Sequence, residues 1–177
     1  MPWGQGGFGG SSATDYLIQF NGGFALVNVE NGDHDGYDSN GCIEVNGGYV
    51  VTNGNEPFDC GDSSGCTLTC NGGVWISNCP AGGMMMGGAE LPASATVSRT
   101  VYADTRVSLV DGSDNVILSF IVDKTVKNFR AGGSGVTSGA SFKSGGTLSG
   151  STYFQQEDQT QLAAFGGKLS GGTTITP

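Results

Sequence analysis

The sequence predicts an all-β protein in which a short right-handed parallel β-helix of three 25-residue coils precedes a small antiparallel β-sheet or sandwich cap. The triplet Asn-Gly-Gly begins at residues 21, 46 and 71, so the period is 25 without a slip. Apolar residues alternate with other types on both sides of each triplet, which is typical of strands. Because the unit is too short for a propeller blade and shows no helical pattern, stacked coils of strand are the remaining repeat architecture.

Each repeat is expected to hold a strand, a tight corner at the two glycines, and a second strand. Equivalent residues of stacked coils should lie about 4.8 Å apart, which places one residue type in each column. The glycines are expected where the chain turns with positive φ. Two columns are predicted to form the apolar interior and a third to form an amide ladder: Phe20/Val45/Cys70, Leu26/Val51/Ile76 and Asn28/Asn53/Asn78.

The chain is expected to divide into a glycine-rich ordered arm at 1–14, the coils at 15–90, and a cap domain at 91–177. The cap should contain a β-hairpin of 107–110 and 116–122 around a turn at 111–114, with 126–130 as a third strand. Such a cap would cover the backbone that the last coil exposes. Residues proposed to anchor the arm or close the coils are Trp3, Phe8, Met84, Met85 and Met86, and the methionines could instead form a binding patch.

Charge is distributed unevenly along the chain. All seven basic residues follow residue 98, whereas ten of the sixteen acidic residues precede it. This asymmetry supports a boundary near Leu91 and argues against binding to nucleic acid or to an anionic membrane. No apolar run approaches the length needed to span a bilayer.

The five cysteines all lie in the repeat region. Cys70 occupies a predicted core column, as a free buried thiol or as half of an inward bridge. Cys60 and Cys66 flank a short loop that a disulfide could close. The connectivity cannot be read from the spacing, and an odd count leaves one sulfur over.

An acidic loop connects the first and second repeats. Its oxygen donors Asp33, Asp35, Asp38 and Asn40, with intervening glycines, suit a calcium loop. The alternative is a set of solvated corner residues that bond their own backbone. The next corner repeats the acidic character more weakly at Asp59 and Asp62, and His34 is expected to be a solvated loop residue.

Several segments carry a family resemblance: Asp35-Gly-Tyr-Asp38-Ser-Asn-Gly41, the two later Asn-Gly-Gly units, the methionine-rich end, and Val107–Phe120 with Gly145–Gly150. Together, over residues 15 to 150, they resemble the C-terminal half of bacterial secreted carbohydrate-binding domain-containing proteins, which are pectate-lyase-like right-handed β-helices. The resemblance implies an extracellular or cell-surface location, a plant cell-wall or acidic polysaccharide as ligand, and Ca²⁺. By position, it implies Asp33, Asp35, Asp38 and Asn40 as the calcium ligands.

The inventory of side chains argues against an enzyme. The known lyases use an arginine as base beside calcium-held uronate, but no Arg or Lys occurs in residues 1–98. A hydrolase would use clustered aspartates, and the basic residues that should hold the substrate carboxylates are missing. We therefore expect a binding module with stacking aromatics at Trp75, Tyr37 and Trp3, where Trp75 has outward parity. Alternatively, Trp75 covers the C-terminal sheet.

A structural role is the second hypothesis. A coil with nothing beneath it exposes unpaired strand edges, and head-to-tail joining through such an end gives a filament. Trp3, Phe8 and the three methionines would then serve in assembly.

Overall fold

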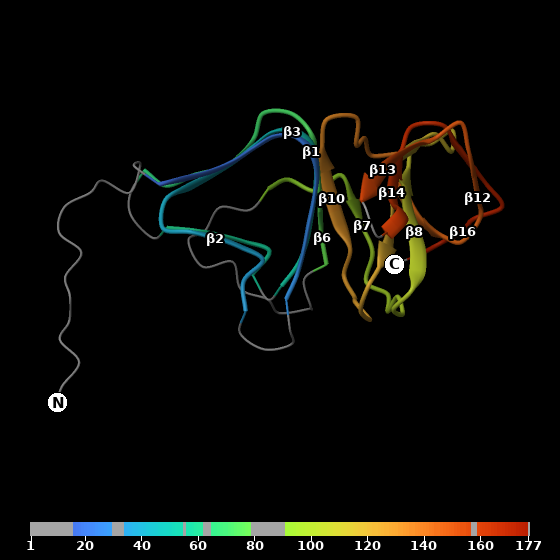
Figure 1. Ribbon diagram of the computed structural model, residues 1–177, viewed down its shortest axis with the longest axis horizontal. Coiled ribbons are helices and arrows are strands. Elements are labelled where there is room, and N and C mark those ends of the chain that lie inside the picture. The colour runs from blue at the N-terminus through green and yellow to red at the C-terminus, as the bar shows by residue number, and fades with distance from the viewer. Residues whose placement is uncertain are drawn as a thin grey trace.

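The computed structural model describes residues 16–29, 34–54, 56–61, 65–78, 91–156 and 159–176, and these residues form strands and no helix (Figure 1). The all-β prediction is confirmed for this part of the chain. Consequently, it has no helix long and apolar enough to cross a membrane. In chain order the strands are β1 (Leu17–Asn28), β2 (Tyr37–Ser39), β3 (Cys42–Asn53), β4 (Phe58–Cys60), β5 (Leu68–Cys70), β6 (Val74–Ser77), β7 (Ala95–Thr96), β8 (Thr105–Val110), β9 (Val116–Val122), β10 (Arg130–Gly133), β11 (Ser141–Ser144), β12 (Thr147–Ser149), β13 (Thr152–Gln156), β14 (Gln159–Phe165), β15 (Lys168–Ser170) and β16 (Thr173–Thr174).

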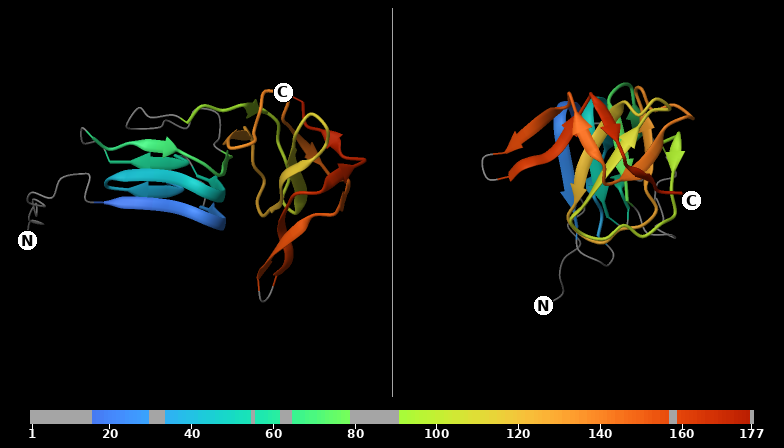
Figure 2. Two further views of the ribbon diagram at one scale, coloured as in Figure 1. Left: turned by 90° about the horizontal axis from the view of Figure 1, so that it is seen from above. Right: turned by 90° about the vertical axis from the view of Figure 1, so that its right-hand side faces the viewer.

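The three repeats stack in parallel at the predicted register. Phe20 lies beside Val45 and Leu26 beside Val51, so β1 and β3 pair with an offset of 25 residues. The same offset pairs β3 with β5 and with β6. β1 and β3 bend together at the Asn-Gly-Gly corner, where the ladder is irregular, and the stacked strands follow one course (Figures 1 and 2).

The glycines at the corner are required by close backbone contact between repeats. A Cβ atom on Gly47 would lie 2.7 Å from the carbonyl oxygen of Asn21, and one on Gly72 would lie 2.5 Å from that of Asn46. The second glycine of each pair has positive φ, +76° at Gly48 and +72° at Gly73. Any larger residue at these positions would force the stacked strands apart.

Amide side chains form two ladders along the stack. In the predicted Asn28/Asn53/Asn78 column, Asn53 donates to Asn28 Oδ1 at 3.0 Å, whereas the buried Asn78 Oδ1 has no hydrogen-bond partner among the described residues. The corner asparagines form a further ladder, in which Asn46 donates to Asn21 at 3.2 Å and Asn71 donates to Asn46 at 2.8 Å. These bonds reinforce the same 25-residue register.

The predicted single interior is wrong, because the two columns assigned to it face opposite sides of the sheet. Val45 belongs to a repeat-side core, whereas Val51 and Ile76 belong to an interface core against the C-terminal half. The corner disrupts the ladder and changes which alternate residues point inward. The repeat-side core comprises Ile43, Val45, Val50, Phe58, Cys60, Leu68, Trp75 and Leu91; the interface core includes Val51, Val74, Ile76, Val107, Leu109, Leu118, Phe120, Phe129 and Phe142.

The C-terminal half builds an antiparallel sheet in the order β13-β14-β9-β8-β11-β16, which we call the C-terminal sheet. The predicted hairpin is confirmed, since β8 and β9 pair antiparallel with Ser108 opposite Ser119. The predicted third strand is wrong: Val126 makes only an isolated bridge to Val101, and β10 begins at Arg130. The segment between Val126 and Arg130 is not a strand. Its residue Phe129 is fully buried in the interface core, where its ring contacts those of Phe120 and Phe142.

β10 continues the sheet of the repeats rather than the hairpin. It pairs antiparallel with β6, placing Gly132 opposite Trp75, and on its other side it pairs with β7. The resulting repeat sheet has the order β1-β3-β6-β10-β7, with β5 beside β3. The C-terminal half therefore covers the backbone edge of the last repeat, and Lys124 reaches back to the carbonyl of Val29 in the first repeat.

Candidate functional site

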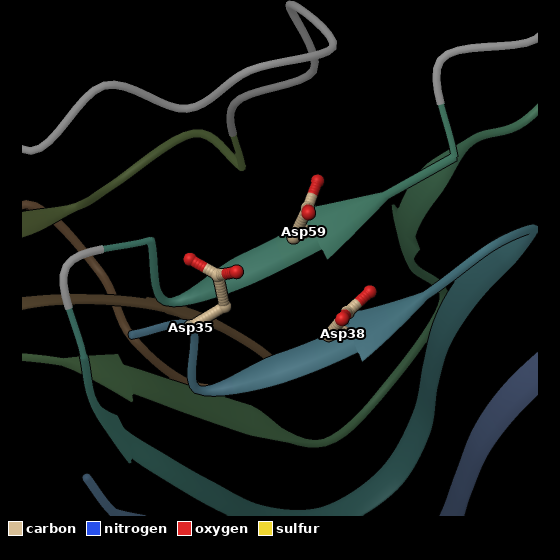
Figure 3. A group of neighbouring side chains, drawn as sticks. All are labelled: Asp35, Asp38 and Asp59. Atoms are coloured by element: carbon tan, nitrogen blue, oxygen red, sulfur yellow. The ribbon is translucent and has the colours of Figure 1, made fainter. Parts of the chain in front are cut away.

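Three aspartates gather on the small sheet beside the repeats. β2 and β4 pair in parallel with Asp38 beside Asp59, and Asp35 lies just before β2. One carboxylate oxygen from each of the three lies within 4.8 Å of the others (Figure 3). Three like charges this close repel one another, and a bound cation would offset that repulsion.

This acidic cluster overlaps with the predicted calcium ligands in two positions. Asp35 and Asp38 are brought together, whereas Asn40 follows the end of β2 with an exposed side chain. Asp33 lies outside the described residues. Asp59 was not among the predicted ligands, although its position in the second acidic corner was a signal for it. Three carboxylates would supply part of the six to eight oxygen ligands that Ca²⁺ takes, with backbone carbonyls and water for the rest.

Trp75 is not a surface ring. Only 3% of it is exposed, it belongs to the repeat-side core, and a Cβ on the facing Gly132 would lie 2.7 Å from its Nε1. The prediction that Trp75 points outward is wrong for the same reason as the predicted single interior. The irregular corner changes which alternate side chains point into the repeat-side core. The ring therefore offers no free face to a sugar.

Tyr37 is also a packing residue. Its ring lies edge-on to Phe20 at 4.8 Å and stacks on Phe58 at 5.8 Å between centroids. Its hydroxyl donates to the carbonyl of Val51 at 3.4 Å, and burial raises its pKa above the usual range. Two neighbouring rings thus occupy the side chain predicted to bind ligand. The other predicted ligand or assembly residues, Trp3, Phe8, Met84, Met85 and Met86, lie outside the described residues.

Cys42, Cys60 and Cys70 are free thiols in the structure. Cys60 is buried, and burial raises the pKa of its thiol to about 11. The Cys70 thiol, whose pKa burial also raises, donates to the carbonyl of Gly72 at 3.2 Å. A neutral buried thiol is a poor nucleophile and a packing group.

In the reduced native protein, Cys60 is therefore expected to react with iodoacetamide more slowly at pH 8 than Cys42, which is only half-buried. Its rate should rise as the pH approaches 11 and on unfolding, because the thiolate is the reactive form. Mass spectrometry of the labelled peptides measures both rates. Equal labelling of Cys60 and Cys42 at pH 8 would show that Cys60 is neither buried nor protonated.

The C-terminal half holds a pocket that sequence reasoning did not find. Its volume is about 440 Å³. The Arg99 guanidinium is held at its rim, because Nε donates to the carbonyl of Thr176 at 3.2 Å. Tyr102 is 71% exposed, the highest value among the exposed large apolar side chains of the described chain. The lining is Arg99, Thr100, Val101, Tyr102, Thr105, Ser144, Thr174, Ile175 and Thr176.

The pocket lies where strands from distant parts of the sequence meet. β11 pairs with β8 on one side and with β16 on the other, which brings Thr105, Ser144 and Thr174 together. Only the local sequence around Arg99, the first basic residue of the chain, and Tyr102 could have indicated this site. The pairing with the last strand could not be foreseen.

The chain matches no protein-family profile, no curated protein and no solved structure.

Proposed function

We propose that the chain is an extracellular, non-catalytic carbohydrate-binding module that takes an acidic polysaccharide, such as one from plant cell walls, at the Arg99–Tyr102 pocket. The single observation that supports this best is the pairing of an exposed aromatic ring with a fixed guanidinium at one pocket. The family resemblance and the stacked repeats, which we propose wind as a right-handed β-helix, give independent support.

The chemistry of the lining suits a sugar acid. A tyrosine ring offers an apolar face and a polar tip, and hydroxyls of threonine and serine donate and accept hydrogen bonds. The free edge of a guanidinium matches a carboxylate in shape and charge. A uronate residue would therefore place its ring on Tyr102 and its carboxylate towards Arg99.

Binding without turnover is supported by what lines the pocket. None of the nine lining residues is Asp, Glu, His or Cys. Glycoside hydrolysis needs a pair of carboxyl groups, and general acid–base catalysis needs a group that titrates near neutral pH. The acidic cluster of Asp35, Asp38 and Asp59 contributes no residue to this pocket.

Affinity electrophoresis in gels containing polygalacturonate or a neutral glucan tests the proposal. Arg99→Ala is expected to weaken retention by polygalacturonate at least tenfold, because loss of a charge-assisted bond costs about 1.5–3 kcal/mol. Tyr102→Ala should weaken it similarly. Lys127→Ala, which removes an exposed charge outside the pocket, is the matched control and should behave as wild type. Retention unaffected by both pocket variants would overturn the assignment.

We further propose that the acidic cluster binds Ca²⁺ as a structural ion. This calcium site is supported by the three converging carboxylates and by the calcium dependence that the family resemblance implies. Millimolar Ca²⁺ is expected to raise the melting temperature of the wild type, and Asp38→Asn should reduce that shift by more than half. Asp123→Asn, an exposed acid of the C-terminal half, is the control. The idea fails if Ca²⁺ produces no shift, or the same shift in Asp38→Asn.

A filament subunit is the second candidate, and the unpaired edge of β1 favours it. The opposite end of the repeat sheet is continued by β10 and the two-residue β7, so head-to-tail joining would place β1 against a very short edge. The geometry therefore supports the binding module better. Electron micrographs showing strings with a one-subunit repeat would favour the filament.

A further inference from the structure

Among the described strands, β1 pairs on one side only. It is the first strand of the repeat sheet, and no described strand pairs with its outer side. The Tyr16 carbonyl and the Val29 N–H both bond to β3. By alternation, the backbone groups that point away from β3 belong to Leu17 and Gln19 before the corner and to Phe24, Leu26 and Asn28 after it. These groups form a ready template for a further strand.

Apart from the irregular corner, the edge lacks the features that usually protect such strands. Residues 16–29 contain no charged residue and no proline, in a chain whose formal net charge is −9. Tyr16 and Leu17 are 48% and 50% exposed and are two of the three exposed large apolar side chains of the described part. Natural edge strands are normally short, bulged or charged. The edge strand itself therefore adds no charge repulsion between two copies of this acidic chain.

Gly22 is a glycine that its own surroundings do not require. A Cβ at the equivalent Gly47 or Gly72 would strike the backbone of the repeat beneath, but a Cβ at Gly22 would meet nothing within 4 Å. Its φ is not in the left-handed range. A glycine within a strand costs roughly 0.5–1 kcal/mol relative to alanine. Its absent side chain would project over the open edge, so glycine here leaves that edge bare for a close neighbour.

We propose that this neighbour is a second copy of the chain, paired antiparallel along β1 across a two-fold axis through the Gly22–Gly23 corner. β1 bends at this corner (Figure 1). The corner divides β1 into two arms, one before and one after it. A two-fold axis exchanges these arms only if it bisects the bend. Both arms of one copy therefore pair with the other copy only when the two corners lie against each other. Such an interface uses the same patch on both copies and closes after two.

The register that follows agrees with the directions of the backbone and the side chains. Gln19 of one copy lies opposite Leu26 of the other, and Leu17 lies opposite Asn28; all four direct their backbone groups outward. Ile18 and Phe20 pack on the repeat-side core, and the column of Ala25 belongs to the same core. Phe20 then meets Ala25 of the other copy, so apolar faces continue across the axis.

The dimer goes beyond the proposed function and does not depend on it. None of the residues lining the Arg99–Tyr102 pocket belongs to β1, so pairing along β1 uses no residue of the pocket. If both proposals hold, each dimer presents two pockets, and retention on a polymer gains from the effective concentration of the second. Failure of one proposal leaves the other standing, because mass and glycan retention are measured separately.

Sedimentation equilibrium of the full chain tests the dimer. The wild type is expected at twice the mass of one chain, and Gly22→Glu should be monomeric, with association weakened at least 100-fold. Its fold should persist, since a Cβ at Gly22 meets open space. Gly112→Glu, in the exposed turn between β8 and β9, is the matched control and should remain dimeric. Leu17→Lys provides a second edge variant with the same expected loss.

Hydrogen exchange checks the register. The amides of Gln19 and Leu26 should exchange at least tenfold faster in Gly22→Glu than in the wild type, whereas amides of β9 should not change. A monomeric wild type overturns the proposal; if its Gln19 and Leu26 amides are protected, residues N-terminal to Tyr16 occupy the edge. A dimer or larger assembly unaffected by Gly22→Glu and Leu17→Lys also overturns it.

Discussion

Alanine at position 48 is expected to destabilise the protein by about 2–5 kcal/mol. Its Cβ would lie 2.5 Å from the carbonyl carbon of Gly22 in the strand beneath, and the residue would have to keep φ at +76°. Overpacking costs about 1–3 kcal/mol and the left-handed conformation about 1–2 kcal/mol. Urea denaturation followed by circular dichroism measures the change.

Gly171→Ala separates the two costs. Gly171 has nearly the same φ, +73°, and a Cβ there would meet nothing within 4 Å. Its replacement should cost only the conformational part, about 1–2 kcal/mol. Equal losses at both positions would mean that the repeats do not contact each other at their corners.

Trp75→Ala is expected to cost about 3–5 kcal/mol, the range for removal of a large aromatic from a core. The ring is 3% exposed and packs between the repeat-side core and Gly132. Tyr102→Ala, which removes an exposed ring, should change the free energy of unfolding by less than about 0.5 kcal/mol. Denaturant titration of both variants gives the comparison.

For retention on polygalacturonate, the order of the two effects should be reversed: the variant that loses most stability should lose least binding. Trp75→Ala protein that remains folded should keep its retention on polygalacturonate, and Tyr102→Ala should lose it. A stable Trp75→Ala variant with lost retention would restore Trp75 as the ligand platform and remove the pocket.

The sequence predicted the stack because its signal is local and repeated. Positions 21, 46 and 71 carry the same triplet, and backbone contact between neighbouring repeats makes those glycines necessary. The hairpin of β8 and β9 was predictable for a similar reason, since alternation and a short turn lie within one segment.

The side of the sheet to which each side chain points, and the pairing of strands far apart in the sequence, were not predictable in the same way. Parity counts assume an unbroken alternation, and the corner between Phe20 and Phe24 breaks it, so Trp75 was assigned to the wrong side. Asp38 and Asp59 are 21 residues apart, not 25, because the loops around β2 and β4 differ in length. The Arg99–Tyr102 pocket needs the last strand of the chain, whose pairing no local pattern encodes.

Nuclear Overhauser contacts of the Val51 methyl groups test the central claim most directly, namely that the repeats stack at a 25-residue offset with two opposite cores. Leu26, Val51 and Phe120 line one small void on the interface side, and Ile76 lies beside Val51 in the ladder. We expect contacts from Val51 to Leu26, Ile76 and Phe120 and none to Val45. Contacts from Val51 to Val45 without any to Leu26 or Ile76 would contradict it.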